Sequence, residues 1–166
     1  MQWTEGTAEK RLAELKMSDL PVMSVSPKKT TVDTDWFQKY KELCKQFTRS
    51  LTDCVQELSL MNLNRDEFMG LLMGREIPAN LSIRFKVPLF WGGKLELDNM
   101  FMCYTFPISH NLDRFIIEQS GNDIIWLPNP ARKIYLPIHS TLTGNGGNAV
   151  SDRLSQMSAN KTAGRR

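Results

Sequence analysis

The sequence has little of what marks the most easily recognised classes of protein. Among its 166 residues there are three cysteines, two histidines and a net charge of only +3. No apolar run reaches the roughly 18 residues that a membrane-spanning helix needs. Residues 1–17 are polar and charged, without the apolar stretch of a signal peptide. An odd number of cysteines with no such signal favours free thiols, so we expect a cytoplasmic protein.

Residue patterns that carry chemistry are also absent. The cysteines form no C-x-x-C pair, and neither His110 nor His139 has a second histidine at helical spacing. No nucleophile elbow and no phosphate-binding loop with its G-K-[ST] ending is present. We therefore expect no metal, no cofactor and no catalytic residue. A non-catalytic protein is favoured over an enzyme, although an active site built from sequence-distant residues would leave no local motif.

What is present is the composition of an ordinary globular domain, with 41% hydrophobic and 23% charged residues. Basic and acidic side chains balance over residues 1–138, so the whole positive excess lies in residues 139–166. This last segment is rich in Gly, Asn, Ser and Thr. It is predicted to be a basic tail that binds a partner, or else a solvated tail.

The chain divides into three segments on these grounds. Residues 1–33 are predicted to be an N-terminal arm or linker, with a possible short helix over residues 7–17. Residues 34–138 are predicted to form a single domain. Residues 139–166 are the tail, in which Val150, Leu154 and Met157 share one face of a possible short docking helix.

Residues 34–61 carry the strongest periodicity in the chain. Apolar residues recur at alternating spacings of three and four, as in a heptad seam: Phe37, Tyr40, Cys44, Phe47, Leu51, Cys54, Leu58 and Met61. One helix over this range would be roughly 42 Å long, more than a small domain usually needs. Part of the seam is therefore predicted to meet another chain, the alternative being a long core helix.

A second helix is expected after Asn64, because Asn64 and Glu67 have the spacing of a capping box. Alternating or apolar segments, several ended by proline, then predict strands at 81–87, 94–97, 100–106, 124–127 and 132–136. The segment 100–106 is apolar on both faces, as in a strand covered on both sides. Residues 113–119 could be strand or helix, and the turn at 120–123 favours a hairpin.

Helices followed by closely spaced strands predict an α+β fold with a largely antiparallel sheet. With no catalytic pattern, the favoured function is a non-catalytic protein–protein interaction or a structural subunit of an assembly, through a protein partner or self-association. The residues predicted to contact that partner are Phe37, Tyr40, Phe47, Leu51, Leu58, Trp91, Val150, Leu154 and Met157.

The alternative is a nucleic-acid-associated protein in which bases and a tryptophan contact phosphates and stacked bases. The residues predicted for that role are Arg84, Lys86, Trp126, Arg132, Lys133, Arg165 and Arg166.

Overall fold

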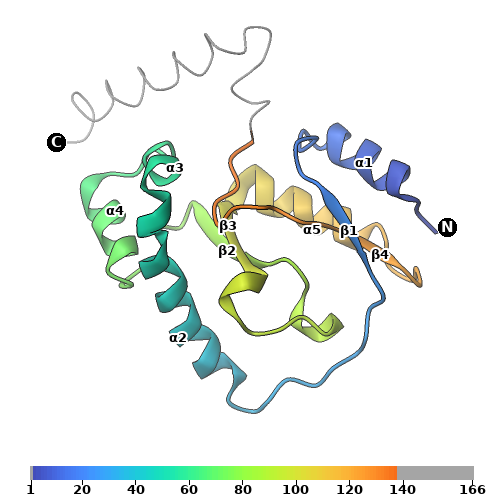
Figure 1. Ribbon diagram of the computed structural model, residues 1–166, viewed down its shortest axis with the longest axis horizontal. Coiled ribbons are helices and arrows are strands. Elements are labelled where there is room, and N and C mark those ends of the chain that lie inside the picture. The colour runs from blue at the N-terminus through green and yellow to red at the C-terminus, as the bar shows by residue number, and fades with distance from the viewer. Residues whose placement is uncertain (1, 138–166) are drawn as a thin grey trace, which may run out of the picture.

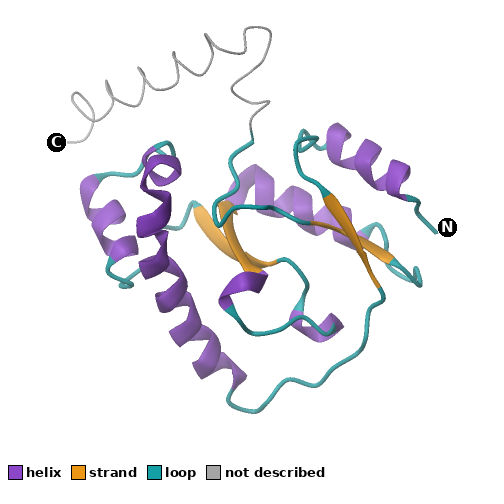
Figure 2. Ribbon diagram, in the orientation of Figure 1, coloured by secondary structure: helices purple, strands orange, loops and turns teal. Residues whose placement is uncertain are grey.

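The computed structural model describes residues 2–137 and shows an α+β fold (Figures 1 and 2). The helices and strands, in chain order, are α1 (Glu5–Glu14), β1 (Val22–Val25), α2 (Trp36–Arg49), α3 (Val55–Ser59), α4 (Arg65–Leu72), β2 (Leu81–Phe85), β3 (Met100–Tyr104), α5 (His110–Ile117) and β4 (Ile125–Pro128). No helix in the described range is long and apolar enough to cross a membrane.

The strands form two small antiparallel pairs rather than one sheet. β2 pairs with β3, with Ile83 opposite Met102 and Arg84 opposite Phe101. β1 pairs with β4, with Ser24 opposite Trp126. The antiparallel arrangement expected from the sequence is thus confirmed, although the strands are fewer than expected. Residues 94–97 form no strand, and segment 132–136 contributes only a bridge from Ile134 to Met102.

Strand β3 separates two hydrophobic clusters. Met100 and Met102 belong to a cluster shared with α2, α3 and α4, while Phe101 and Cys103 belong to a second cluster shared with α1 and α5. Figure 1 shows this arrangement, with β2 and β3 between the two groups of helices. All four side chains are almost completely buried. The predicted double coverage of this strand is confirmed.

The single long helix expected over residues 34–61 is not confirmed. α2 ends at Arg49, and a 3-10 segment, Ser50–Cys54, leads into α3. The Ser50 hydroxyl donates to the carbonyl of Phe47, and Lys133 donates to the carbonyl of Ser50. Side-chain bonds of this kind compete with the regular backbone ladder of a helix, and they coincide with the change in helix type.

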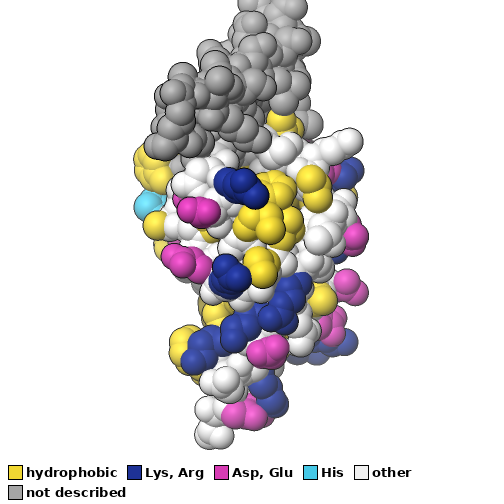
Figure 3. Space-filling model, turned by 90° about the vertical axis from the view of Figure 1, so that its left-hand side faces the viewer, with side chains coloured by type: hydrophobic (Ala, Val, Ile, Leu, Met, Phe, Trp, Pro, Cys, Tyr) yellow, Lys and Arg dark blue, Asp and Glu magenta, His cyan; other side chains and the backbone are white. Residues whose placement is uncertain are grey.

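The outer side of α2 is basic rather than apolar. Lys41, Lys45 and Arg49 follow one another at four-residue spacing, and all three are exposed. Figure 3 views the face that holds α2 and α4 and shows Lys and Arg side chains gathered in a band across it. No carboxylate in the described residues forms an ion pair with these three side chains.

The N-terminal segment is not confirmed as an extended arm. Ala8 and Leu12 of α1 are buried in the second cluster, and β1 lies within the segment expected to be a linker. Residues 113–119 are also not a strand. They belong mainly to α5, where Leu112 and Phe115 lie one helical turn apart and face the same cluster. The predicted turn at 120–123 therefore connects α5 to β4.

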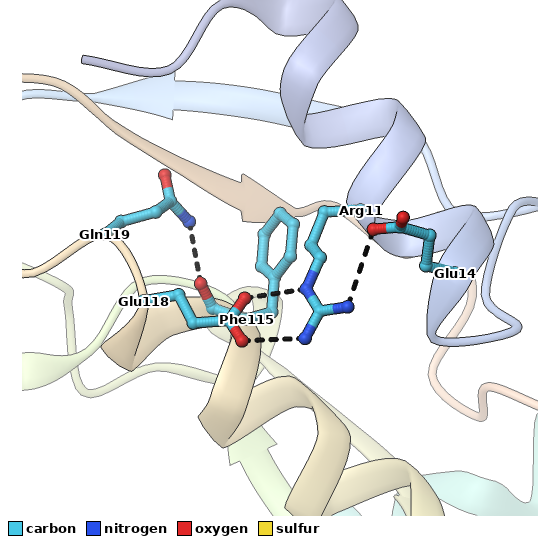
Figure 4. Close-up of polar contacts among 5 residues, drawn as sticks. All are labelled: Arg11, Glu14, Phe115, Glu118 and Gln119. Carbon is cyan, nitrogen blue, oxygen red and sulfur yellow. Dashed lines mark hydrogen bonds and ion pairs between the residues drawn. The ribbon is translucent and has the colours of Figure 1, made fainter. Parts of the chain in front are cut away.

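An ion pair ties α5 to α1, and a buried amide ties it to β4. Figure 4 shows the ion pair and the bond from the amide of Gln119 to Phe115. Arg11 donates from Nε and Nη2 to the two oxygens of Glu118, each at 2.7 Å. The buried Gln119 donates to the carbonyls of Phe115 and Trp126 and accepts from the backbone nitrogen of Trp126. The hydrogen bonds from Arg11 lower the pKa of the Glu118 carboxyl, because they favour its charged form.

We expect Glu118→Gln to destabilise the folded protein by about 1 kcal/mol at neutral pH, the upper range for a surface pair with two-point geometry. A carboxyl group whose pKa is lowered by folding stabilises the folded protein at pH values above its pKa in the unfolded chain. This stabilisation is lost as the pH falls through its pKa in the folded protein. The difference in unfolding free energy from wild type should therefore be constant above about pH 5 and shrink as the pH falls below the ordinary carboxyl pKa. Urea unfolding across pH measures it.

Glu14→Gln is the matched control, since Glu14 makes a single 3.5 Å contact with the same guanidinium. It should change stability much less. A deficit in Glu118→Gln that stays the same at pH 3 would show that the ion pair is not its cause.

Candidate functional site

An apolar groove of about 560 Å³ lies between β2, α5, the start of α2 and the loop after β2. We call it the Arg84 groove. Its charged lining residues are Arg84 and Asp113. The other lining residues are apolar: Val32, Trp36, Ile83, Phe85, Pro88, Leu89, Phe90, Ile116 and Ile117. A largely apolar concave surface with a few converging polar groups is the usual form of a binding site.

One wall of the groove is the loop after β2, and Asn99 holds that loop closed. Its Oδ1 accepts from the backbone nitrogen of Val87, and its Nδ2 donates to the carbonyls of Val87 and Lys94, all at 2.9 Å. Gly93 packs so tightly that a Cβ there would lie 1.9 Å from the Val87 carbonyl oxygen. The loop thereby presents Pro88, Leu89 and Phe90 in a fixed position.

The segment before α2 braces the same loop from outside. The Thr30 hydroxyl donates to the carbonyl of Leu89 at 2.7 Å, and its backbone nitrogen donates to the carbonyl of Phe90. The backbone nitrogen of Lys28 donates to the carbonyl of Trp91. These bonds bring the stretch that follows β1 beside the loop that follows β2, so segments about 60 residues apart form one edge of the groove.

Arg84 lies against the groove with one of its three nitrogens fully engaged. Nη1 donates to Oγ and to the carbonyl of Ser109, at 2.8 and 3.2 Å, and to Oδ1 of Asp113 at 2.8 Å. Its side chain is only 16% exposed. Among the described residues, nothing accepts a hydrogen bond from Nε or Nη2. Neither atom is sealed from solvent, since the only buried, unpaired side-chain polar atom in this range is Nδ2 of Asn122.

The rim of the groove is apolar and exposed. Val32, Phe90 and Ile117 line it with 46%, 58% and 66% of their surface accessible. Phe37, next to the lining residue Trp36, is also exposed, and Lys41 lies over its ring with Nζ 5.1 Å from the ring centre. Large apolar side chains grouped at the mouth of an apolar groove are typical of a surface that another molecule covers.

The predicted partner-binding residues fall in several environments. Phe47, Leu51 and Leu58 are buried in the first cluster, so the structure places this part of the seam against the protein's own core. Tyr40 is half-buried beside Phe85, with ring centres 5.8 Å apart. Phe37 is exposed near the groove, and Trp91 is half-buried in the loop beside it. Val150, Leu154 and Met157 lie outside the described residues.

The described residues among those predicted for nucleic-acid contact lie in several environments. Arg84 pairs with Asp113, Arg132 with Glu57 and Lys133 with Asp53. Trp126 on β4 packs against the second cluster and donates from Nε1 to the carbonyl of Trp3. The Lys86 side chain lines a different depression, beside Lys94 and Asp98. Arg165 and Arg166 lie outside the described residues.

The cysteines are placed as small buried side chains. Burial raises the pKa of all three thiols, and that of Cys103 to about 12. A thiol with so high a pKa stays protonated at neutral pH and is a poor nucleophile. Within residues 2–137, no group of three or more histidine, cysteine or acidic side chains could hold a metal ion.

Several residues of the groove were not identified from the sequence. Ser109, Asp113 and Ile117 come together with Arg84 only because residues 110–117 form a helix, whereas residues 113–119 were expected to favour a hairpin. The sequence showed apolar and polar residues alternating around Arg84, with Ile83 and Phe85 on either side. Such alternation predicts a strand but does not indicate which residues pack against it. A 3.6-residue period in Leu112, Phe115 and Ile116 was the available signal.

We expect Asn99→Asp to destabilise the protein by about 1–3 kcal/mol. The new carboxylate can still accept from the Val87 nitrogen but would face the carbonyl oxygens of Val87 and Lys94 with no proton to donate. Urea unfolding measures the change. Asn129→Asp is the control, because Asn129 is exposed and its side chain makes no hydrogen bond to a described residue. Equal stability of the two variants would contradict the proposed clamp.

No protein-family model, no curated protein and no solved structure matches the chain.

Proposed function

We propose that the protein is a non-catalytic interaction protein or assembly subunit, and that the Arg84 groove is where it binds a partner. The observation that carries this proposal is the exposed apolar rim formed by Val32, Phe90 and Ile117 around an apolar groove. Fully burying a side chain of this kind stabilises a complex by roughly 1.5–3 kcal/mol. Covering three at once can therefore anchor a partner.

The proposed contact surface excludes most of the apolar seam predicted over residues 34–61. Phe47, Leu51 and Leu58 are occupied by the core, whereas Phe37 and Trp36 at the start of α2 remain close to the groove. The rim draws on α5 and on two loops that are braced against one another. A preformed surface of this kind loses less conformational entropy on binding than a flexible one. The tail residues Val150, Leu154 and Met157 remain a predicted second contact.

The nucleic-acid alternative has one supporting observation. Lys41, Lys45 and Arg49 form a basic stripe on α2 whose charges are not paired with a carboxylate in the described range. Three of the bases predicted for this role are instead held in ion pairs. The apolar groove favours a protein partner, since a phosphate backbone would leave its apolar rim uncovered.

The test is capture from a lysate of the native host by the immobilised full chain, quantified by mass spectrometry. Phe90→Ser and Ile117→Ser should each reduce recovery of the specific partner by about tenfold or more, the effect expected for a central anchor residue. Both positions are exposed, so the variants should keep the wild-type circular dichroism and melting temperature.

Met69→Ser and Ile124→Ser are matched controls, because both residues are exposed and apolar but neither lines the groove. They should retain the partner as wild type does. Nuclease treatment of the lysate before capture separates protein contacts from contacts made through nucleic acid. Partner recovery that responds equally to the rim and control variants, or that disappears with nuclease, would overturn the proposal.

A further inference from the structure

We propose that the Arg84 groove recognises a segment of a partner protein in which one carboxylate lies among apolar side chains, and that Arg84 binds this carboxylate. The inference rests on the proposed function and names the chemistry of the partner. Two features of the groove carry it together. One is an arginine with unused donors in a fixed orientation, and the other is the apolar groove that this arginine lines.

The orientation of Arg84 is set before any partner arrives. Three acceptors converge on Nη1: the Ser109 carbonyl, the Ser109 hydroxyl and Oδ1 of Asp113. Ser109 is itself buried. Because the guanidinium is planar, fixing Nη1 also fixes the directions of Nε and Nη2. These two nitrogens form the edge that receives a carboxylate with two parallel hydrogen bonds.

Arg11 shows the same recognition within the protein. Its Nε and Nη2 donate to the two oxygens of Glu118 at 2.7 Å, while its Nη1 contacts Glu14 (Figure 4). Arg84 uses Nη1 in the same way, for Ser109 and Asp113, but no carboxylate in the described residues occupies its Nε and Nη2 edge. The vacant edge of Arg84 is thus the edge that Arg11 uses to hold a carboxylate.

The charge balance around the groove also favours an anionic group. Asp113 offers Arg84 one oxygen and is 56% exposed, so solvent screens much of its charge. Lys28 and Lys29 lie on the segment that braces the groove loop, and Lys41 lies over Phe37; all three are exposed and form no ion pair within the described range. Asp33 and Asp35, the nearest acidic pair on the chain, are held by Lys39.

The apolar walls select among anions. Ile83, Phe85, Ile116 and Ile117 have side chains that offer no hydrogen bonds to the water that surrounds a phosphate or a free small anion. A carboxylate on a peptide brings apolar neighbours that cover these walls. Its source can be a Glu or Asp side chain or a chain terminus, and the chemistry at Arg84 is the same for both.

The test titrates three short peptides into the ¹⁵N-labelled full chain and follows backbone amide shifts by NMR. The first is acetyl-Leu-Phe-Glu-Leu-Phe-amide, and the second has Gln in place of Glu. The third has the Gln sequence with a free terminal carboxylate. We expect shifts at Ile83, Phe85 and Ile117, with the Glu peptide binding about tenfold or more tightly than its Gln counterpart. Tight binding of the third peptide alone would assign the carboxylate to a chain terminus.

Two variants separate recognition from folding. Asp113→Asn keeps an oxygen that accepts from Arg84 but removes the competing charge, so it should tighten binding of the Glu peptide and not of the Gln peptide. Arg84→Lys keeps a charge but loses the two-point edge, and should reduce the Glu preference. Arg114→Lys is the control, because Arg114 follows Asp113 on α5 but does not line the groove.

Equal binding of all three peptides at the groove would overturn the role of the carboxylate while leaving a groove that accepts apolar segments. The absence of groove shifts at millimolar peptide would also overturn this inference. The proposed function is judged separately, by the loss of partner capture in the Phe90 and Ile117 variants. The comparison of the Glu and Gln peptides uses wild-type protein, so its result does not depend on how well any variant folds.

Discussion

The burial of β3 on both faces is the constraint on which the rest of the structure depends. Alternate residues of a strand point to opposite sides, so Met100 and Met102 enter one cluster and Phe101 and Cys103 the other. The strand therefore joins α2, α3 and α4 to α1 and α5 through side chains that are almost completely removed from solvent. Met102 of this strand also forms an isolated bridge with Ile134, which belongs to no strand of its own.

The groove follows from this arrangement. β2 is held in register by β3, which places Arg84 opposite Phe101. α5 packs against Phe101 and Cys103 through Leu112 and Phe115 and so brings Ser109 and Asp113 to Arg84. The loop clamped by Asn99 supplies the other wall. An apolar surface and a positioned guanidinium are thus by-products of the packing that stabilises the fold, and together they form a surface suited to an acidic, apolar partner segment.

Local patterns in the sequence predicted the features that depend mainly on neighbouring residues. The capping box at Asn64 and Glu67, the strands at residues 81–85 and 100–104 and the double burial of β3 were all foreseeable. The division of residues 34–61 was not, because the local apolar period runs through the break, where the distant Lys133 donates to the carbonyl of Ser50. The site itself was hidden for the same reason. Ser109 and Asp113 meet Arg84 through tertiary packing of a helix whose short apolar run also fits a strand.

The central claim is that Arg84 is positioned by the folded chain before any partner binds. The most direct test is ¹⁵N relaxation of the Arg84 Nε in the free protein, which reports the order parameter of the guanidinium bond. Three acceptors on Nη1 predict a value near that of rigid backbone, about 0.85. A value below about 0.6, the range of flexible groups, would contradict the account, because an arginine that moves freely cannot present a fixed edge to a carboxylate.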